Sequence, residues 1–210
     1  MMAAIAVLGA GHIGGTLAGR WVQAGHTVTV GVRNPESEAA EQLQAELGDR
    51  GRVVGLSEIG PVVAQADVVL FAVPGGAMEE TIANLASELA GRVVIDAANR
   101  MGDPVRNSLA AFRERVPELL YARAFNSLGW ENFAEPDFGG VKADLFYAGP
   151  AESENAGKLV AELIGDIGLR PVRLGESEDA GLVDSVADLW FALALRRQHG
   201  RHLAFKVLGI

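Results

Sequence analysis

The chain has 210 residues, 49% of them hydrophobic and 21% charged, which fits one globular domain or a domain with a small appendage. Its net charge of -9 makes it poorly suited to bind nucleic acid or an anionic membrane surface, so we expect neither as a partner. The absence of cysteine excludes disulfides, thiolate zinc sites, iron–sulfur clusters and a cysteine nucleophile, and it is compatible with the reducing cytoplasm in which we expect the protein.

The N-terminal residues 1–15 are apolar enough to suggest a signal peptide. They lack a basic region before the apolar run, and their glycines have the spacing of a phosphate-binding loop, so we expect them to belong to the folded protein. No stretch approaches about 18 uninterrupted apolar residues, and the sequence therefore predicts no membrane-spanning helix.

Apolar runs of strand length alternate with helical stretches along the chain. The predicted strands cover residues 3–8, 27–32, 52–55, 67–73, 92–97, 120–125, 144–148 and 171–174. The predicted helices cover residues 12–24, 36–47, 57–64, 77–89, 105–115, 152–167 and 178–195, with Ser153 and Ser177 as candidate caps of the last two and a short amphipathic piece at 201–208. Nearly continuous apolar strands separated by helices predict an α/β fold with a doubly wound, mostly parallel sheet.

The chain divides into a long first part and a short second part. We expect residues 1–150 to form a dinucleotide-binding domain and residues 151–210 a small C-terminal extension that completes its cleft, with a single domain overall as the alternative. The last two predicted helices are candidates for a small helical cap over the cleft or for a dimer contact. The apolar stretch 182–195 could be that dimer face or simply core, and a homodimer is the expected assembly.

A glycine-rich loop follows the first predicted strand and opens the first predicted helix. It reads G-x-G-x-x-G, with Gly9 permitting the tight turn, Gly11 letting the backbone approach a pyrophosphate and Gly14 allowing close packing of helix on sheet. The helix N-terminus offers free N–H groups to phosphates. This is the phosphate loop of a Rossmann fold, and its predicted cofactor-binding residues are Gly9, Ala10, Gly11, His12, Ile13 and Gly14, with His12 as a spacer.

The end of the second predicted strand indicates which dinucleotide binds. An NAD site normally places Asp or Glu there, whereas this strand ends in Val32 and Arg33. A guanidinium can pair with the 2′-phosphate of NADP and stack on the adenine. Asn34 can donate to the same phosphate and Ser37 lies one turn further on. The sequence therefore predicts NADPH in preference to NADH.

Two further strand ends are predicted to line the other half of the cleft. Val73, Pro74 and Gly75 follow the fourth strand, and Ala98 and Asn99 follow the fifth, so both turns lie where a doubly wound sheet binds its ligands. Ordinary strand-to-helix turns would give the same pattern. We interpret Asp96 as a structural hydrogen-bonding acid rather than a catalytic base.

The segment after the sixth predicted strand carries polar and aromatic groups suited to a planar ring. Asn126 and Ser127 are the candidate catalytic residues, because they could polarise an acceptor ring or hold a water while solvent supplies the proton. Leu128 and Trp130 are expected beside the cofactor, and Phe133 is expected in the core.

Three aspartates, Asp179, Asp184 and Asp188, share the last predicted helix. Their spacing does not put all three on one face, so we expect a solvated acidic face and no metal site.

At this point the chain resembles the NADP-dependent coenzyme F420 oxidoreductase family, also called F420-dependent NADP reductases. The segments that carry the resemblance are GAGHIGG, GVRN, DVVLFAVP, RAFNSLGWENF, ADLFYAG, IGLRPVRLG and GRHLAFKVLG, and they span essentially the whole chain. The first are general among Rossmann reductases, whereas AFNSLGWENF and the ending are more specific.

The resemblance implies hydride transfer between NADPH and the deazaflavin ring of coenzyme F420, a small-molecule co-substrate. It also implies that residues 10–13 hold the pyrophosphate, that Val32 and Arg33 meet the 2′-phosphate, that Pro74 and Gly75 approach the nicotinamide and that residues 126–130 lie beside the facing rings. Two alternatives stay open: an NADPH-dependent reductase of an imine, ketone or flavin, and a non-catalytic NADP-binding sensor.

Overall fold

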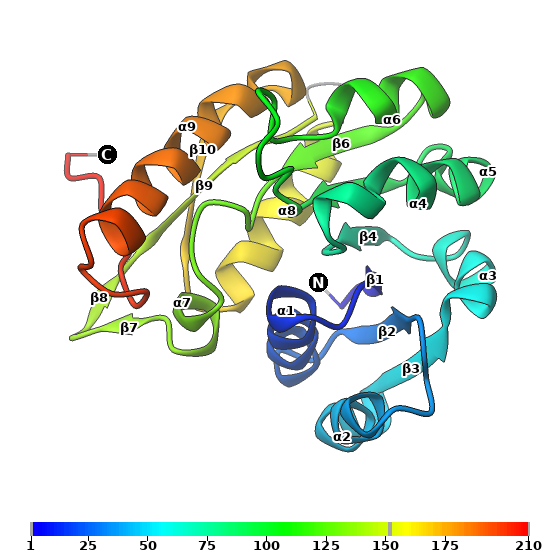
Figure 1. The fold of residues 1–210 in the computed structure, drawn as a ribbon. Helices are drawn as coiled ribbons and strands as arrows, with labels where there is room; N and C mark the ends of the chain where they lie inside the picture. Colours follow the sequence, from blue (N-terminus) through cyan, green and yellow to red (C-terminus); the bar gives the residue numbers. More distant parts are fainter. Residues whose placement is uncertain (1, 151–152, 210) are drawn as a thin grey trace.

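The computed structural model describes residues 2–150 and 153–209, which form one eight-stranded sheet with helices on both faces (Figure 1). The strand order is β10-β9-β6-β5-β4-β1-β2-β3, and every pairing is parallel except β6 with β9. The strands are β1 Ala4–Leu8, β2 Thr27–Val32, β3 Gly51–Gly55, β4 Val68–Phe71, β5 Val93–Asp96, β6 Leu120–Arg123, β9 Asp144–Ala148 and β10 Arg170–Gly175. The predicted doubly wound, mostly parallel α/β sheet is confirmed.

The helices occupy most of the predicted positions. They are α1 His12–Gln23, α2 Glu38–Leu47, α3 Ile59–Val63, α4 Met78–Asn84, α5 Ala86–Leu89, α6 Leu109–Arg115, α7 Glu131–Ala134, α8 Glu154–Asp166 and α9 Ala180–Phe191, which continues as a π-helix over Ala192–Arg196. A small hairpin, β7 Asp137–Phe138 and β8 Val141–Lys142, was not predicted. Within the described residues, no helix has the length and apolarity to cross a membrane.

Strand β1 shows why its sequence is apolar throughout. Ile5 and Val7 pack into the core under α1 and α2, whereas Ala6 and Leu8 pack into the core on the opposite face, under α3 and α4. A parallel strand covered on both faces has no solvated side, so it loses the alternation of an exposed strand.

The C-terminal part of the chain adds strand β10 to this same sheet. Helix α8 packs beside α1, and Trp21 of α1 is fully buried and donates its indole N–H to Leu163 O of α8 at 3.0 Å. The division at residue 150 stays a prediction, and residues 151 and 152, where the predicted extension and its first helix begin, lie outside the described residues.

The structure confirms one predicted helix cap and corrects another cap and one helix boundary. Ser153 caps α8 as predicted, because its hydroxyl accepts from Ala156 N. The prediction for Ser177 is wrong, since that hydroxyl donates to Tyr121 O at 2.6 Å and α9 begins only at Ala180, after a short 3₁₀ turn. The helix predicted from residue 105 begins at Leu109, because Asp96 binds the backbone N–H of Ser108 and holds the preceding residues in an irregular loop.

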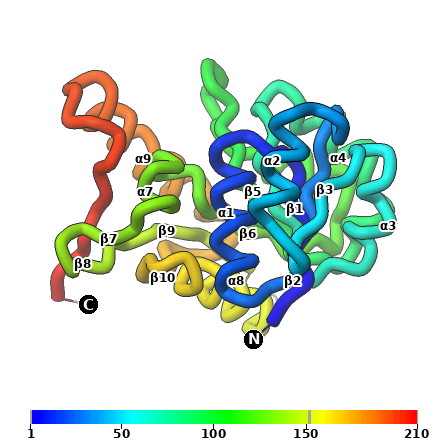
Figure 2. Tube along the Cα trace, turned by 90° about the horizontal axis from the view of Figure 1, so that it is seen from below, coloured from blue at the N-terminus to red at the C-terminus, as the bar shows by residue number. Residues whose placement is uncertain are grey.

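The final segment is irregular rather than helical, and it is bonded to the sheet. Phe205 forms a bridge with Asp144 at the start of β9, and the Asp144 carboxylate accepts from Arg170, Lys206 and Val207 N. Burial alone would raise the pKa of Asp144, but these hydrogen bonds outweigh it and lower the pKa to about 2. Figure 2 shows this segment beside β7 and β8, on the side of the molecule away from β3 and α3.

Candidate functional site

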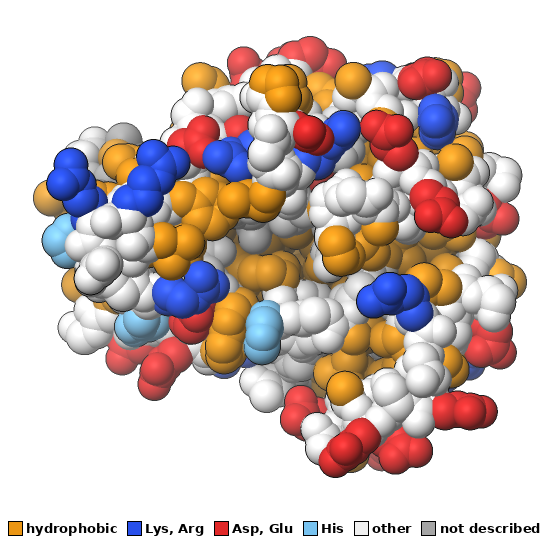
Figure 3. All heavy atoms as spheres, in the orientation of Figure 1, with side chains coloured by type: hydrophobic (Ala, Val, Ile, Leu, Met, Phe, Trp, Pro, Cys, Tyr) orange, Lys and Arg blue, Asp and Glu red, His pale blue; other side chains and the backbone are white. Residues whose placement is uncertain are grey.

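A cleft of about 960 Å³ lies along the carboxyl ends of the central strands, where a doubly wound sheet binds its ligands. Figure 3 shows it as a hollow near the middle of the face, floored by hydrophobic side chains. It collects the predicted residues Gly9, Ala10, Gly11, His12, Ile13, Val32, Arg33, Asn34, Ser37, Val73, Pro74, Gly75, Ala98, Asn99, Asn126, Leu128 and Trp130. Gly14 and Ser127 do not line it; Ser127 is buried with 1% of its surface exposed.

The glycine loop has the geometry that its spacing predicts. Gly9 has φ +102°, and a Cβ there would lie 2.7 Å from Ala72 O. A Cβ on Gly14 would overlap Gly9 O, whereas one on Gly11 would meet nothing within 4 Å. The backbone at Gly11 is therefore open to a ligand, and α1 begins there with no side-chain cap on its first N–H groups. These residues fit a dinucleotide pyrophosphate.

Replacing Gly14 with alanine is expected to lower the free energy of unfolding by about 1–3 kcal/mol and to weaken NADPH binding, because the added methyl group pushes helix α1 away from Gly9. Urea unfolding and a fluorescence titration with NADPH would measure both. Gly15→Ala is the matched control, since its Cβ meets nothing closer than 3.7 Å and alanine favours the helix. Equal losses in the two variants would contradict the proposed packing role of Gly14.

The turn after β2 presents Arg33 at the edge of the cleft. Ser37 caps α2 by accepting from Ala40 N at 3.3 Å and donates to Asn34 O at 2.9 Å, while Asn34 Oδ1 accepts from Glu36 N. These bonds hold the turn and delay the start of α2 from the predicted residue 36 to Glu38. Arg33 is exposed and, within the described residues, makes no ion pair, so its guanidinium is available to a ligand.

Two stacked rings, those of His12 and Trp130, line the cleft beside the glycine loop. The rings of His12 and Trp130 stack at 5.0 Å between centroids with an angle of 14° between their planes. His12 is thus more than the spacer that the sequence predicts, because it supports the flat face of Trp130 inside the cleft. Farther along, the cleft is lined by Trp190, Phe191 and Arg201 from the C-terminal part of the chain, none of which the sequence predicted as site residues.

A buried ionic network underlies the cleft, and sequence reasoning missed it. Arg123 at the end of β6 is fully buried and donates to Asp184 Oδ1 at 2.8 Å and to Asn99 Oδ1 at 2.9 Å, and it lies 3.1 Å from Asp96 Oδ1. Burial alone would lower the pKa of Arg123, but Asp96, Tyr121 and Asp184 raise it overall. The guanidinium therefore stays charged and holds α9 to the ends of β5 and β6.

Asp96 and Asp184 both serve this network. Asp96 accepts from Ala98 N, Ser108 N and the Tyr121 hydroxyl, as its predicted structural role implies. Burial raises the pKa of Tyr121 well above its ordinary value, and neighbouring Asp96 raises it further. The prediction of a solvated acidic face on α9 is wrong for Asp184, which is 7% exposed.

No group of residues that could hold a metal occurs among the described residues.

The network orients the two amides that border the cleft. Asn126 Nδ2 donates to Asp184 Oδ1 at 3.2 Å, and Asn99 Nδ2 donates to Asn126 O at 2.9 Å. Phe125, directly before Asn126, has φ +62°, a left-handed conformation that costs a non-glycine residue about 1–3 kcal/mol. Edge-to-face contacts with Trp21 and Phe133 hold it, and both Phe125 and Phe133 are fully buried, as expected for Phe133.

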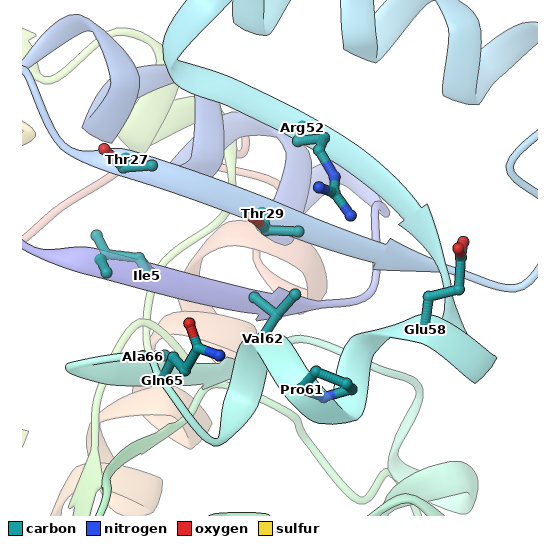
Figure 4. A pocket seen from close by; sticks show the side chains of 10 residues that line it. Ile5, Thr27, Thr29, Arg52, Glu58, Pro61, Val62, Gln65 and Ala66 are labelled. Atoms are coloured by element: carbon teal, nitrogen blue, oxygen red, sulfur yellow. The ribbon is translucent and has the colours of Figure 1, made fainter.

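A second hollow, of about 650 Å³, lies between α3 and strands β1 to β3 (Figure 4). Small side chains such as Thr27, Thr29 and Ala66 face it, with Arg52 and Glu58 at its border. It contains none of the predicted site residues.

Comparison with known proteins gives consistent results. Residues 4–100 match the sequence model of the family "NADP oxidoreductase coenzyme F420-dependent". The chain is similar to the F420-dependent NADP reductase of Methanothermobacter thermautotrophicus, with 28% identity over 94% of this chain and 92% of that protein. Its fold is similar to that of a candidate F420-dependent NADP reductase from Arthrobacter sp. FB24, with a TM-score of 0.81 and 23% identity over 98% of this chain and 99% of the other.

A third similarity is to a hypothetical protein of Sinorhizobium meliloti, with a TM-score of 0.68 and 31% identity over 86% of this chain and 88% of the other.

Proposed function

We propose that this chain, an NADP-dependent oxidoreductase related to the coenzyme F420-dependent NADP reductases, transfers a hydride between NADPH and the deazaflavin ring of coenzyme F420. The observation that carries the proposal is the course of the cleft, from Arg33 past Gly11 to Asn126 and Trp130 and on to Trp190. This course offers one stretch to a dinucleotide and a further aromatic stretch to a second ring.

The proposed reaction requires the protein to bind and orient the nicotinamide and the acceptor ring, and it requires no covalent bond to a side chain. NADPH supplies the hydride, and the acceptor gains that hydride together with one proton from solvent. The protein holds the two rings face to face, and such positioning can account for much of the rate. Arg33 would pair with the 2′-phosphate, the N–H groups of α1 would hold the pyrophosphate, and Trp130 would cover the reacting rings and exclude water.

Asn126 is the residue that we assign to the reacting ring. Its amide lines the cleft and is held by Asp184, so it has a defined orientation. Asn126→Ala is expected to lower kcat about tenfold while the Kd for NADPH changes less than about twofold, because the lost hydrogen bond acts on the acceptor. Steady-state kinetics and a NADPH titration would measure this.

Ser127→Ala is the matched control for that variant. The structure does not bring Ser127 to the cleft, so its kcat is expected to stay within about twofold of the parent. Turnover near that of the parent protein in Asn126→Ala would remove Asn126 from the proposed mechanism, and thermal melting of both variants would exclude a folding defect.

Direct assay tests the function as a whole. Oxidation of NADPH with F420, followed at the deazaflavin absorbance, would support the proposal. Oxidation only with imines, ketones or flavins would replace it with a different reductase of the same fold. Tight NADPH binding without turnover on any acceptor would indicate a non-catalytic sensor.

A further inference from the structure

The stretch that follows α9 is basic in an otherwise acidic protein. Residues 196–206 contain Arg196, Arg197, Arg201 and Lys206 and no Asp or Glu, whereas the whole chain carries -9. Residues 196–202 are all exposed. Figure 3 shows Lys and Arg side chains gathered on the left of the molecule, beside hydrophobic side chains that lead into the hollow.

This basic stretch adjoins the part of the cleft that the dinucleotide does not need. Phe191, Trp190 and Arg201 line the cleft, and Arg196 ends the π-helix that continues from Phe191. Arg196 therefore follows Phe191 by five residues on one continuous helix. π-helical turns are rare and occur frequently at functional sites.

The stretch is held in place by bonds to the rest of the protein. Trp190 Nε1 donates to Leu203 O at 2.7 Å, and Asn132 Nδ2 donates to Arg201 O at 3.0 Å. The ring of His202 stacks on Phe138 at 4.4 Å. The chain at residues 201–203 is therefore held against α9, α7 and β7.

Its cations differ in whether a carboxylate already neutralises them. Arg201 pairs with Glu131, and although burial would raise the pKa of Glu131, the hydrogen bond from Arg201 outweighs it and lowers that pKa. Lys206 pairs with Asp144. Among the residues that the structure describes, Arg196 and Arg197 are exposed and have side chains with no ion pair, so they present two uncompensated guanidinium groups. Neither lines the cleft itself; they follow its lining residue Phe191 by five and six residues.

Building on the proposed function, we propose that Arg196 and Arg197 bind an anionic tail, bearing phosphate or carboxylate groups, on the hydride acceptor. Arg33 and the glycine loop already account for the phosphates of NADPH, so the second set of cations serves the second ligand. Guanidinium groups bind phosphate and carboxylate through paired hydrogen bonds. The acceptor is therefore a planar ring with an acidic tail, not a neutral imine or ketone.

The test uses the double variant Arg196→Gln/Arg197→Gln and three acceptors: complete F420, the same compound without its glutamates, and the deazaflavin ring with only its uncharged ribityl chain. We expect KM for complete F420 to rise about three- to tenfold with kcat and the KM for NADPH unchanged. The KM for the uncharged compound is expected to be the same in parent and variant. If the variant no longer raises KM once the glutamates are removed, the arginines bind the carboxylates of the tail. If it still raises KM for that shortened compound, they bind its phosphate.

Arg52→Gln/Arg115→Gln is the matched control, because it removes two exposed arginine charges away from the cleft. An equal rise in KM in this control would assign the effect to net charge and overturn the proposal. Equal KM values for charged and uncharged rings in the parent protein would overturn it while leaving F420 reduction intact. No turnover with any of the three rings would instead contradict the proposed function itself.

Discussion

Replacing Arg33 with alanine is expected to raise the Kd for NADPH about 10- to 100-fold and to leave the Kd for NADH unchanged. The two cofactors differ only in the 2′-phosphate, and a charge-assisted hydrogen bond contributes about 1.5–3 kcal/mol. Each 1.4 kcal/mol corresponds to about a tenfold change in affinity. Arg33 is exposed at the edge of the cleft and has no competing carboxylate partner within the described residues, so its whole interaction is available to the phosphate.

Titration of protein fluorescence with each cofactor measures this prediction. Arg52→Ala is the control, because it removes an exposed arginine that borders the second hollow instead of the cleft. The effect should shrink as salt is added, since screening shortens the reach of exposed charges. Parallel rises in Kd for NADPH and NADH would mean that Arg33 supports the adenine or the turn, and the assignment of NADP preference to its charge would be wrong.

The parts of the fold that the sequence predicted are those governed by local pattern. Strand β2 was predicted with its observed bounds, because its run of Thr and Val is rich in β-branched residues and lies between polar turns. The glycine loop was equally readable, since its G-x-G-x-x-G spacing lies within six residues and Gly14 packs directly on Gly9 O, although the neighbour of Gly9 itself is Ala72 O after β4. Such features depend on spacing within a short stretch of chain.

The parts that the sequence did not predict depend on partners far away in the chain. Ser177 has the composition of a helix cap, yet its hydroxyl serves Tyr121 O, 56 residues earlier. Asp184 was grouped with solvated acids because its partner Arg123 lies 61 residues away. One signal was present: an arginine in an apolar strand needs a buried counter-charge, and Arg123 stands in such a strand.

This network connects the two halves of the cleft. Arg123 extends from the end of β6 toward Asp96 on β5 and Asp184 on α9, so one side chain joins the sheet to the helix that supplies Trp190 and Phe191. The same Asp184 oxygen also accepts from Asn126. The orientation of Asn126 and the packing of α9 therefore depend on one charged group.

Replacing Arg123 with methionine is expected to lower the free energy of unfolding by about 3–5 kcal/mol, because it leaves two buried carboxylates without their cation. A loss of that size corresponds to a fall in Tm of roughly 6–20 °C for a protein of this length. Urea unfolding with an unchanged m value would measure it. Arg115→Met, which removes only a surface pair with Glu114, is expected to cost less than about 1 kcal/mol.

A second substitution separates the buried charge from lost packing. In Arg123→Met/Asp184→Leu, one stranded carboxylate is removed, so the double variant is expected to recover part of the stability that Arg123→Met loses. Asp96 keeps its three donors from Ala98, Ser108 and Tyr121. Asp184 keeps two, the side-chain amides of Asn107 and Asn126. If the double variant loses the sum of the two single losses, the carboxylates are not the cause, and the contribution of Arg123 lies in its packing and in its bonds to the carbonyl oxygens of Asp96 and Ala98.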